Sequence, residues 1–233
     1  MSDPTKADAS QVDDVFSGMT RKEFLGNSVA AGAAFTIVPR HVLGNGYRAP
    51  SDTLNVAHIG VGGMGGADVN GMSDENIYAL CDVDSRSARQ AFTNHPGAKQ
   101  YKDFRRMLEI DAANIDAVVV STPDHTHAVA SIMALNLGLP VRTQKPLART
   151  IHEVRAMAAA AEAAGVPTQM GNQGHAGPGH RLIREWVEAD LIGTVREVHF
   201  WTNRPIWPQA IDRPTEMHHV PAHFDWDLWL GPA

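Results

Sequence analysis

The chain of 233 residues has little of what marks several common protein classes. Its single cysteine, Cys81, cannot form an internal disulfide and excludes a metal site built from several thiolates. With a formal net charge of −6, the chain lacks the basic excess that is typical of nucleic-acid-binding proteins. Its N-terminal apolar stretch is too short and too rich in Gly and Ala for a stable membrane span. With 43% hydrophobic and 20% charged residues, the composition is that of a globular protein.

The N-terminal residues 1–52 have a different texture from the rest of the chain. Residues 1–19 are polar, and the basic pair Arg21-Lys22 then precedes a short stretch of small apolar residues. This layout is typical of a secretion signal and resembles a twin-arginine signal, which directs export of folded, cofactor-loaded proteins. We therefore expect a signal-like leader and linker over residues 1–52, and an exported, periplasmic protein. The alternative is a disordered leader on a cytoplasmic enzyme.

From Leu54 onward, short apolar runs alternate with segments that have helical character. Strands are expected at residues 54–59, 77–81, 99–101, 117–121, 141–144 and 167–170. Helices are expected after Gly65, over 85–93, 103–109 and 125–137, and from Thr150 to Gly165, where Thr150 and Glu153 form a capping box. This alternation predicts an α/β fold with a doubly wound parallel sheet of the Rossmann type at residues 53–174.

The pattern changes after Gly171, where four glycines and a proline fall within residues 171–179. An amphipathic helix is expected around residues 181–187, and residues 195–202 alternate like a half-buried strand. We expect residues 175–233 to begin a second α/β domain. One helix and one strand cannot easily bury a core, so this domain is expected to be incomplete in the chain.

A glycine-rich motif, Gly60-Val-Gly-Gly-Met-Gly65, follows the first expected strand. In a dinucleotide-binding turn these glycines permit the tight turn, the approach of a pyrophosphate and close helix packing. Asp82 lies 22 residues after Gly60 at the end of the second strand, where a carboxylate binds the adenosine ribose and repels a 2′-phosphate. NAD is therefore favoured over NADP, although Arg86 could accept NADP. The expected cofactor contacts here are Gly60, Gly62, Gly63, Met64, Gly65 and Asp82.

The segment Ser121-Thr-Pro-Asp-His-Thr-His127 stands at the carboxyl end of the most apolar strand, where open α/β sheets bind their ligands. We expect Ser121, Thr122 and Pro123 to contact the cofactor, Asp124 to help cap the next helix, and His127 to line the cofactor pocket. Two histidines two residues apart do not face together on a helix, so no metal site is expected here.

Lys145 and Pro146 follow the next strand, and Asn172 follows the last one. A lysine at a strand end near a nicotinamide could donate a hydrogen bond or a proton to a substrate hydroxyl, whereas an isolated lysine is usually a solvated surface residue. Four residues further along are the candidates for a polar, aromatic-lined substrate pocket: His175, Asn203, Arg204 and Trp207. The alternative for these four is a surface loop, and the spacing of the later histidines matches no standard metal site.

Taken in order, these motifs resemble the Gfo/Idh/MocA oxidoreductases, the glucose–fructose oxidoreductase and inositol dehydrogenase group. The resemblance is carried by the glycine motif, Ala79–Asp82, Ser121–His127, Lys145-Pro146-Leu147 and Gln169–His175. The leader and the stretches at residues 39–44, 201–208 and 225–232 are similar to the secreted branch of that family. The resemblance implies a Rossmann domain followed by an α/β domain with a mostly antiparallel sheet, which often forms a homo-oligomer interface.

The resemblance also implies NAD(P)-dependent oxidation or reduction of a sugar or cyclitol carbon. It implies a catalytic or substrate-binding role for Lys145. We also expect Lys145, Pro146 and Asn172, at their strand ends, to contact the cofactor. The chain departs from the family at Gln144, where the family usually has Glu, and a neutral residue there changes the charge beside Lys145. The family's further catalytic Asp and His would lie beyond residue 233.

Three functions therefore remain open from the sequence. The first is dehydrogenation, with hydride transfer between a ring carbon and the nicotinamide. The second keeps NAD but uses transient oxidation of a sugar to allow elimination, which gives net cleavage of a glycoside. The third is a non-catalytic nucleotide-binding relative, which the neutral residue at Gln144 and the expected incomplete second domain both allow.

Overall fold

The computed structural model describes residues 52–233, and residues Thr53–Ala233 form one unit. The expected export signal and most of the expected linker lie outside the described residues. Within the described part, no helix is both long and apolar enough to cross a membrane. The strands are β1 (Asn55–Ile59), β2 (Asn76–Cys81), β3 (Lys99–Tyr101), β4 (Ala117–Val120), β5 (Val141–Gln144) and β6 (Thr168–Gly171).

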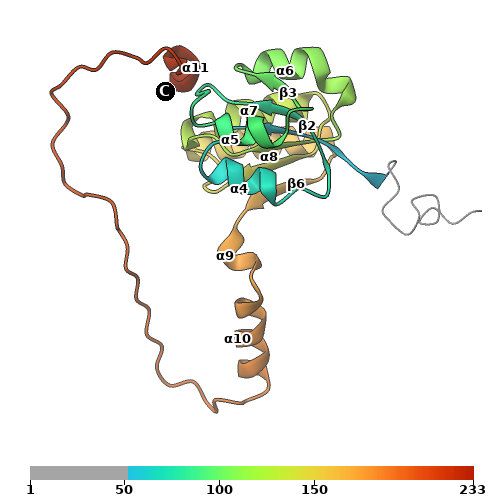
Figure 1. Ribbon diagram of the computed structural model, residues 1–233. Coiled ribbons are helices and arrows are strands. Elements are labelled where there is room, and N and C mark those ends of the chain that lie inside the picture. The colour runs from blue at the N-terminus through green and yellow to red at the C-terminus, as the bar shows by residue number, and fades with distance from the viewer. Residues whose placement is uncertain (1–51) are drawn as a thin grey trace, which may run out of the picture. The chain divides into compact units, whose positions relative to one another are not determined.

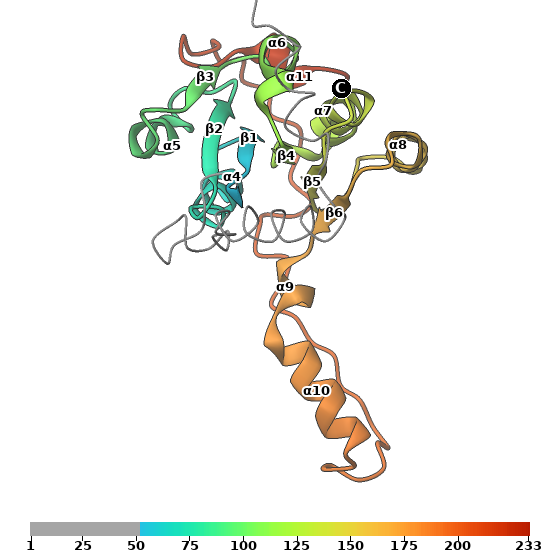
Figure 2. The same ribbon diagram turned by 90° about the vertical axis from the view of Figure 1, so that its right-hand side faces the viewer.

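These six strands form one parallel sheet in the order β3-β2-β1-β4-β5-β6, which can be followed across Figure 2. The expected doubly wound Rossmann sheet is therefore confirmed. The strand order reverses between β1 and β4, and such a switch point is where open α/β sheets bind ligands. β1 and β4 are almost fully buried, which agrees with their continuous apolar sequences.

The helices follow the strands as the sequence alternation predicts. They are α4 (Met64–Asn70), α5 (Arg89–Asn94), α6 (Phe104–Asp111), the short 3₁₀ helix Ala112–Asn114, α7 (Asp124–Asn136), α8 (Ile151–Ala164), α9 (Gln173–Ala176), α10 (Pro178–Glu188) and α11 (Trp226–Leu230). The capping box at the start of α8 is confirmed, because Thr150 Oγ1 accepts from the Glu153 amide and Glu153 accepts from the Thr150 amide. Gly165 ends this helix with φ 63°, as a left-handed C-cap.

Apolar side chains fill both faces of the sheet. On one face α6 and α7 cover β1, β2 and β4 with a cluster that includes Met107, Leu108 and Leu135. On the other face α4 and α5 contribute a smaller cluster around Val69 and Leu80. Successive side chains of β5 point to opposite faces of the sheet. Val141 belongs to the cluster under α6 and α7, whereas the side chain of Arg142 reaches Asp68 on α4.

Residues 178–222 behave differently, because every one of them is exposed. The amphipathic helix expected around residues 181–187 is present as α10, but the strand expected at residues 195–202 is wrong: this segment is neither helix nor strand. A strand exists only through hydrogen bonds to a neighbour, and the described residues give this segment none. Residues 52–233 accordingly contain no antiparallel sheet of a second domain, and between α10 and α11 they form no further helix (Figure 1).

Candidate functional site

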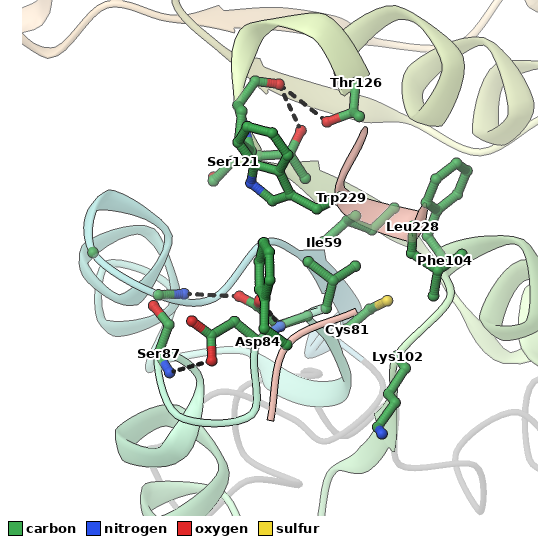
Figure 3. Close-up of a pocket in the computed structure, with 18 residues that line it drawn as sticks. Ile59, Cys81, Asp84, Ser87, Lys102, Phe104, Ser121, Thr126, Leu228 and Trp229 are labelled. Carbon is green, nitrogen blue, oxygen red and sulfur yellow. Dashed lines mark hydrogen bonds between the residues drawn. The ribbon is translucent and has the colours of Figure 1, made fainter. Parts of the chain in front are cut away.

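The site lies where the carboxyl ends of β1, β2 and β4 meet. A cavity of about 380 Å³ opens there between the glycine-rich turn after β1, the loop after β2 and the start of α7 (Figure 3). Of the expected cofactor contacts, the structure brings seven together around this cavity: Gly60, Gly62, Gly63, Asp82, Ser121, Thr122 and Pro123. Met64 and Gly65 stand in the first turn of α4 behind them.

The turn after β1 has no room for a Cβ at three positions. A Cβ on Gly62 would come within 1.9 Å of the Ser87 hydroxyl oxygen. A Cβ on Gly65 would come within 2.0 Å of the Gly60 carbonyl oxygen, which keeps the start of α4 tight against the turn. A Cβ on Gly60 would come within 2.8 Å of the Ser121 backbone, and Gly60 also has φ +79°, a conformation that L side chains rarely adopt. At these glycines the backbone carries no side chain, as the approach of a pyrophosphate requires.

Asp82 closes the turn against the end of β2. Its carboxylate accepts hydrogen bonds from the amides of Val61 (2.8 Å), Gly62 (3.2 Å) and Asp84 (2.9 Å). These bonds hold the carboxylate at the pocket wall, beside the glycine turn. A carboxylate in this place can bind two ribose hydroxyls, as the spacing from Gly60 predicts.

His127 is buried and does not line the cavity, which corrects the expectation from its sequence position. Its Nδ1 lies 2.7 Å from the carbonyl oxygen of Pro146 and its Nε2 lies 2.8 Å from that of Thr122. A neutral imidazole can donate to one of them at a time. The ring therefore lies between the loop after β4 and the loop after β5 and can donate to either of them. The expectation that Asp124 helps to cap the next helix is also wrong. Asp124 is the first residue of α7, and no side chain caps this helix by a hydrogen bond.

Lys145 is exposed just beyond β5, beside the cis Lys145–Pro146 peptide bond, and neither residue lines the cavity. The Lys145 amide donates to Gln144 Oε1 at 3.2 Å. Gln144 is buried, and its Nε2 donates to both carboxylate oxygens of Asp68 on α4, at 3.0 and 2.8 Å. The structure thus explains why position 144 has a neutral side chain. A glutamate there would place a second carboxylate against Asp68, and the two like charges would repel each other.

Asp68 is the centre of a buried polar cluster that the sequence did not reveal. Besides Gln144 it accepts from Ser121 Oγ at 2.6 Å and from Arg142 Nη1 at 3.0 Å. Its partners come from chain positions 53 to 76 residues away, so no local pattern could indicate them. The cluster joins α4 to the ends of β4 and β5, and so links the cofactor loop at Ser121 with the strand that leads to Lys145.

Two buried titratable groups adjoin the site. Burial lowers the pKa of His58 from 6.5 to about 4, while the charge of Asp68 opposes this shift. Burial also raises the pKa of the Cys81 thiol, with Asp82 and Asp103 adding to the effect, so this cavity-lining cysteine is a protonated apolar group. His58 Nε2 has no hydrogen-bond partner among the described residues.

The remaining expected contacts are not gathered at the cavity. Asn172 is exposed. It is the N-cap of α9, where its Oδ1 accepts a hydrogen bond from the His175 amide. The candidate substrate residues His175, Asn203, Arg204 and Trp207 are all exposed, and none lines the cavity. Their assignment stays a prediction. In the described part of the chain, His, Cys, Asp and Glu side chains form no group of three that could hold a metal ion.

Sequence reasoning also missed part of the cavity wall. Asp84 and Ser87 line it from the loop after β2, and their nearness to Asp82 in the sequence was the signal that could have found them. Lys102 lines it from the loop after β3, and Phe104 lines it from the first position of α6. Three further residues, Phe224, Leu228 and Trp229, come from the far end of the chain, and no local pattern pointed to them.

Comparisons with known proteins agree with this geometry. Inositol 2-dehydrogenase 2 of Saccharopolyspora erythraea is 28% identical over 164 residues, which are 68% of this chain and 48% of that protein. The chain spans about half the length of such curated relatives or less. The crystal structure of myo-inositol 2-dehydrogenase from Lactobacillus plantarum matches with a TM-score of 0.56 and 27% identity, over 61% of this chain and 43% of that one.

A second solved structure, scyllo-inositol dehydrogenase from Lactobacillus casei with bound NAD(H) and scyllo-inositol, matches with a TM-score of 0.54. At 22% identity, over 60% of this chain and 42% of that one, it shows the shared fold alone. The family model described as the oxidoreductase family with an NAD-binding Rossmann fold matches residues 54–172. Because this match covers more than half of the chain, the chain belongs to the Gfo/Idh/MocA oxidoreductase family, as its motifs predict.

Proposed function

We propose that this protein is an NAD-dependent oxidoreductase that transfers hydride between a cyclitol or sugar carbon and the nicotinamide. The observation that carries the proposal is the cavity at the switch point of the sheet, where the bare glycine turn and the Asp82 carboxylate lie side by side. The curated relatives named inositol 2-dehydrogenase favour a cyclitol as the substrate class.

The residues present fit the cofactor. The turn at Gly60–Gly65 leaves no space for a Cβ at Gly62 or Gly65, and the first turn of α4 supplies amides for a pyrophosphate. Asp82 would hold the ribose hydroxyls and disfavour the 2′-phosphate of NADP, so we propose NAD as the preferred form. The bound nicotinamide supplies the hydride acceptor, and the protein supplies position and electrostatics.

Lys145 is the proposed catalytic residue. It follows β5 at the edge of the sheet where the strands carry their carboxyl ends, and its ammonium group can donate a hydrogen bond or a proton to the reacting oxygen. The Asp68–Gln144 pair fixes the backbone from which this side chain projects, through the bond from the Lys145 amide to Gln144. Gln144 therefore keeps a positioning role, which weakens the case for a non-catalytic relative.

The test compares the full-length protein with its Lys145→Ala variant, using myo-inositol, scyllo-inositol and NAD. We expect NADH to accumulate with the unmodified protein, and the variant to turn over at least about 100-fold more slowly, the usual contribution of a general acid or base. NAD binding should be unchanged. The control is Arg155→Ala, which removes an exposed cation of α8, outside the loop that carries Lys145.

Two outcomes would contradict this proposal. Cleavage of an aryl glycoside without net NADH would favour oxidation and elimination, the second function left open by the sequence. Binding of NAD with no turnover of cyclitols, sugars or glycosides, unaffected by Lys145→Ala, would indicate a nucleotide-binding protein without the chemistry.

A further inference from the structure

Residues 223–231, here called the returning segment, rejoin the Rossmann domain beside Asp82. The His223 carbonyl oxygen accepts from the Ser85 amide at 3.0 Å, and the Asp225 amide donates to the Val83 carbonyl at 2.9 Å. Between these bonds, Phe224 forms an isolated antiparallel bridge with Asp84. The returning segment is thus hydrogen-bonded to Val83 and Ser85, on either side of Asp84, just after Asp82 in the sequence.

A second anchor holds the other end of the returning segment to the start of α7. His125 Nε2 lies 2.7 Å from the Trp229 carbonyl oxygen, and the two rings meet edge to face with centroids 5.0 Å apart. Beyond α11, the space around Gly231 is closed by Thr126, whose methyl carbon would lie 3.3 Å from an added Cβ. The returning segment therefore spans from the loop after β2 to the helix after β4, on either side of the glycine turn.

Between the two anchors, the returning segment supplies one wall of the cavity. Phe224, Leu228 and Trp229 line it, and Figure 3 shows Leu228 and Trp229 reaching it from the faint red ribbon of α11. Ile59 at the end of β1 and Phe104 at the start of α6 add apolar surface, while Asp82 and the glycine turn form the polar part. An apolar cavity wall beside a carboxylate that would bind the ribose suits a purine ring attached to that ribose.

We propose that the returning segment is the surface on which the adenine ring of NAD packs, with Trp229 and Leu228 as its contact residues. The inference rests on the proposed use of NAD and extends it to residues outside the part matched by the family model. The adenosine half occupies the cavity, with its ribose at Asp82 and its phosphates at Gly62 and Gly63. The nicotinamide half extends out of the cavity toward Lys145, which does not line it.

The experiment measures binding of NADH, ADP and nicotinamide mononucleotide to the whole chain by calorimetry. In Trp229→Ala we expect the affinity for NADH and for ADP to fall about tenfold each, the size of a lost stacking contact with a base. Affinity for nicotinamide mononucleotide should not change. Trp229→Phe keeps an aromatic ring and should restore most of the ADP affinity, which separates a lost contact from misfolding. The control is Trp201→Ala, because Trp201 is 88% exposed.

Wild-type affinity of Trp229→Ala for ADP would overturn the inference, and so would an equal loss for nicotinamide mononucleotide, or failure of the unmodified chain to bind ADP. The proposed dehydrogenase function fails on a different result. If NADH and ADP bind as expected but no cyclitol or sugar is oxidised, the assignment of the adenine contact to the returning segment is kept. The assignment of the reaction is then wrong.

Discussion

The same types of residue are buried in the sheet domain and exposed in the stretch at residues 178–222. Met107 is fully buried under the sheet, whereas Met217 is 98% exposed. Gly65 lies against the backbone of the glycine turn, whereas Gly179 has no atom within 4 Å of an added Cβ. His58 is buried, and His219 is exposed. The difference shows that residue type alone does not determine whether a residue is buried. Burial depends on the neighbours that the folded sheet places around it.

The methionine pair gives the largest expected effect on stability. Met107→Ala leaves a cavity in the core between α6 and the sheet, and should lower the free energy of unfolding by about 2–5 kcal/mol. Met217→Ala removes no packing and should change it by less than about 0.5 kcal/mol. Urea denaturation of both variants measures the difference. Equal losses would mean that residues 178–222 are packed in solution, which would break the comparison.

The glycine pair tests the cofactor loop directly. Gly65→Ala places a Cβ 2.0 Å from the Gly60 carbonyl oxygen, so the turn and the first amides of α4 must shift. Losing two hydrogen bonds to a charged phosphate should weaken NADH binding roughly 100-fold. Gly179→Ala adds a methyl group in open space and should leave NADH affinity unchanged.

Titration calorimetry of the two glycine variants with NADH measures the difference. Unchanged affinity in Gly65→Ala would show that the turn can relax without losing its phosphate contacts, and the fit of the cofactor argued above would then fail. A loss in Gly179→Ala would instead extend the binding site into residues 178–222.

The same contrast separates what the sequence could predict from what it could not. The strands and the capping box at Thr150 were predictable because their signals are local: a short apolar run ending in glycine or proline, or two residues three apart. The glycine turn and Asp82 were predictable because a fixed spacing follows from the βαβ unit. The segment at residues 195–202 has the alternation of a strand but no neighbour to pair with, and alternation by itself cannot supply one.

Long-range pairings account for the parts of the site that the sequence left hidden. Ser85 meets His223 across 138 residues, and Asp68 meets Gln144 across 76. Neither pair follows from a local period or a motif. For His127 the local signal was misleading. Its position after a strand end predicted that it lines the cavity, but its ring nitrogens face two backbone carbonyl groups instead.

The histidine pair gives the smallest effect and depends on pH. Burial holds the pKa of His58 at about 4, against 6.5 in the unfolded chain, so between these values the unfolded state binds more protons. Stability from this group is therefore present above pH 6.5 and is lost as the pH falls toward 4. Between pH 7 and pH 5 the loss should be about 2 kcal/mol.

His58→Leu removes the titrating ring, and its Nε2 has no hydrogen-bond partner among the described residues to lose. Relative to the unmodified protein, this variant should gain those 2 kcal/mol between pH 7 and pH 5. His219→Leu is the matched control in the exposed stretch and should follow the unmodified protein at both values. Denaturation curves at the two pH values measure the change. If His58→Leu and the unmodified protein lose stability in parallel, His58 is solvated and the polar cluster around Asp68 is open to water.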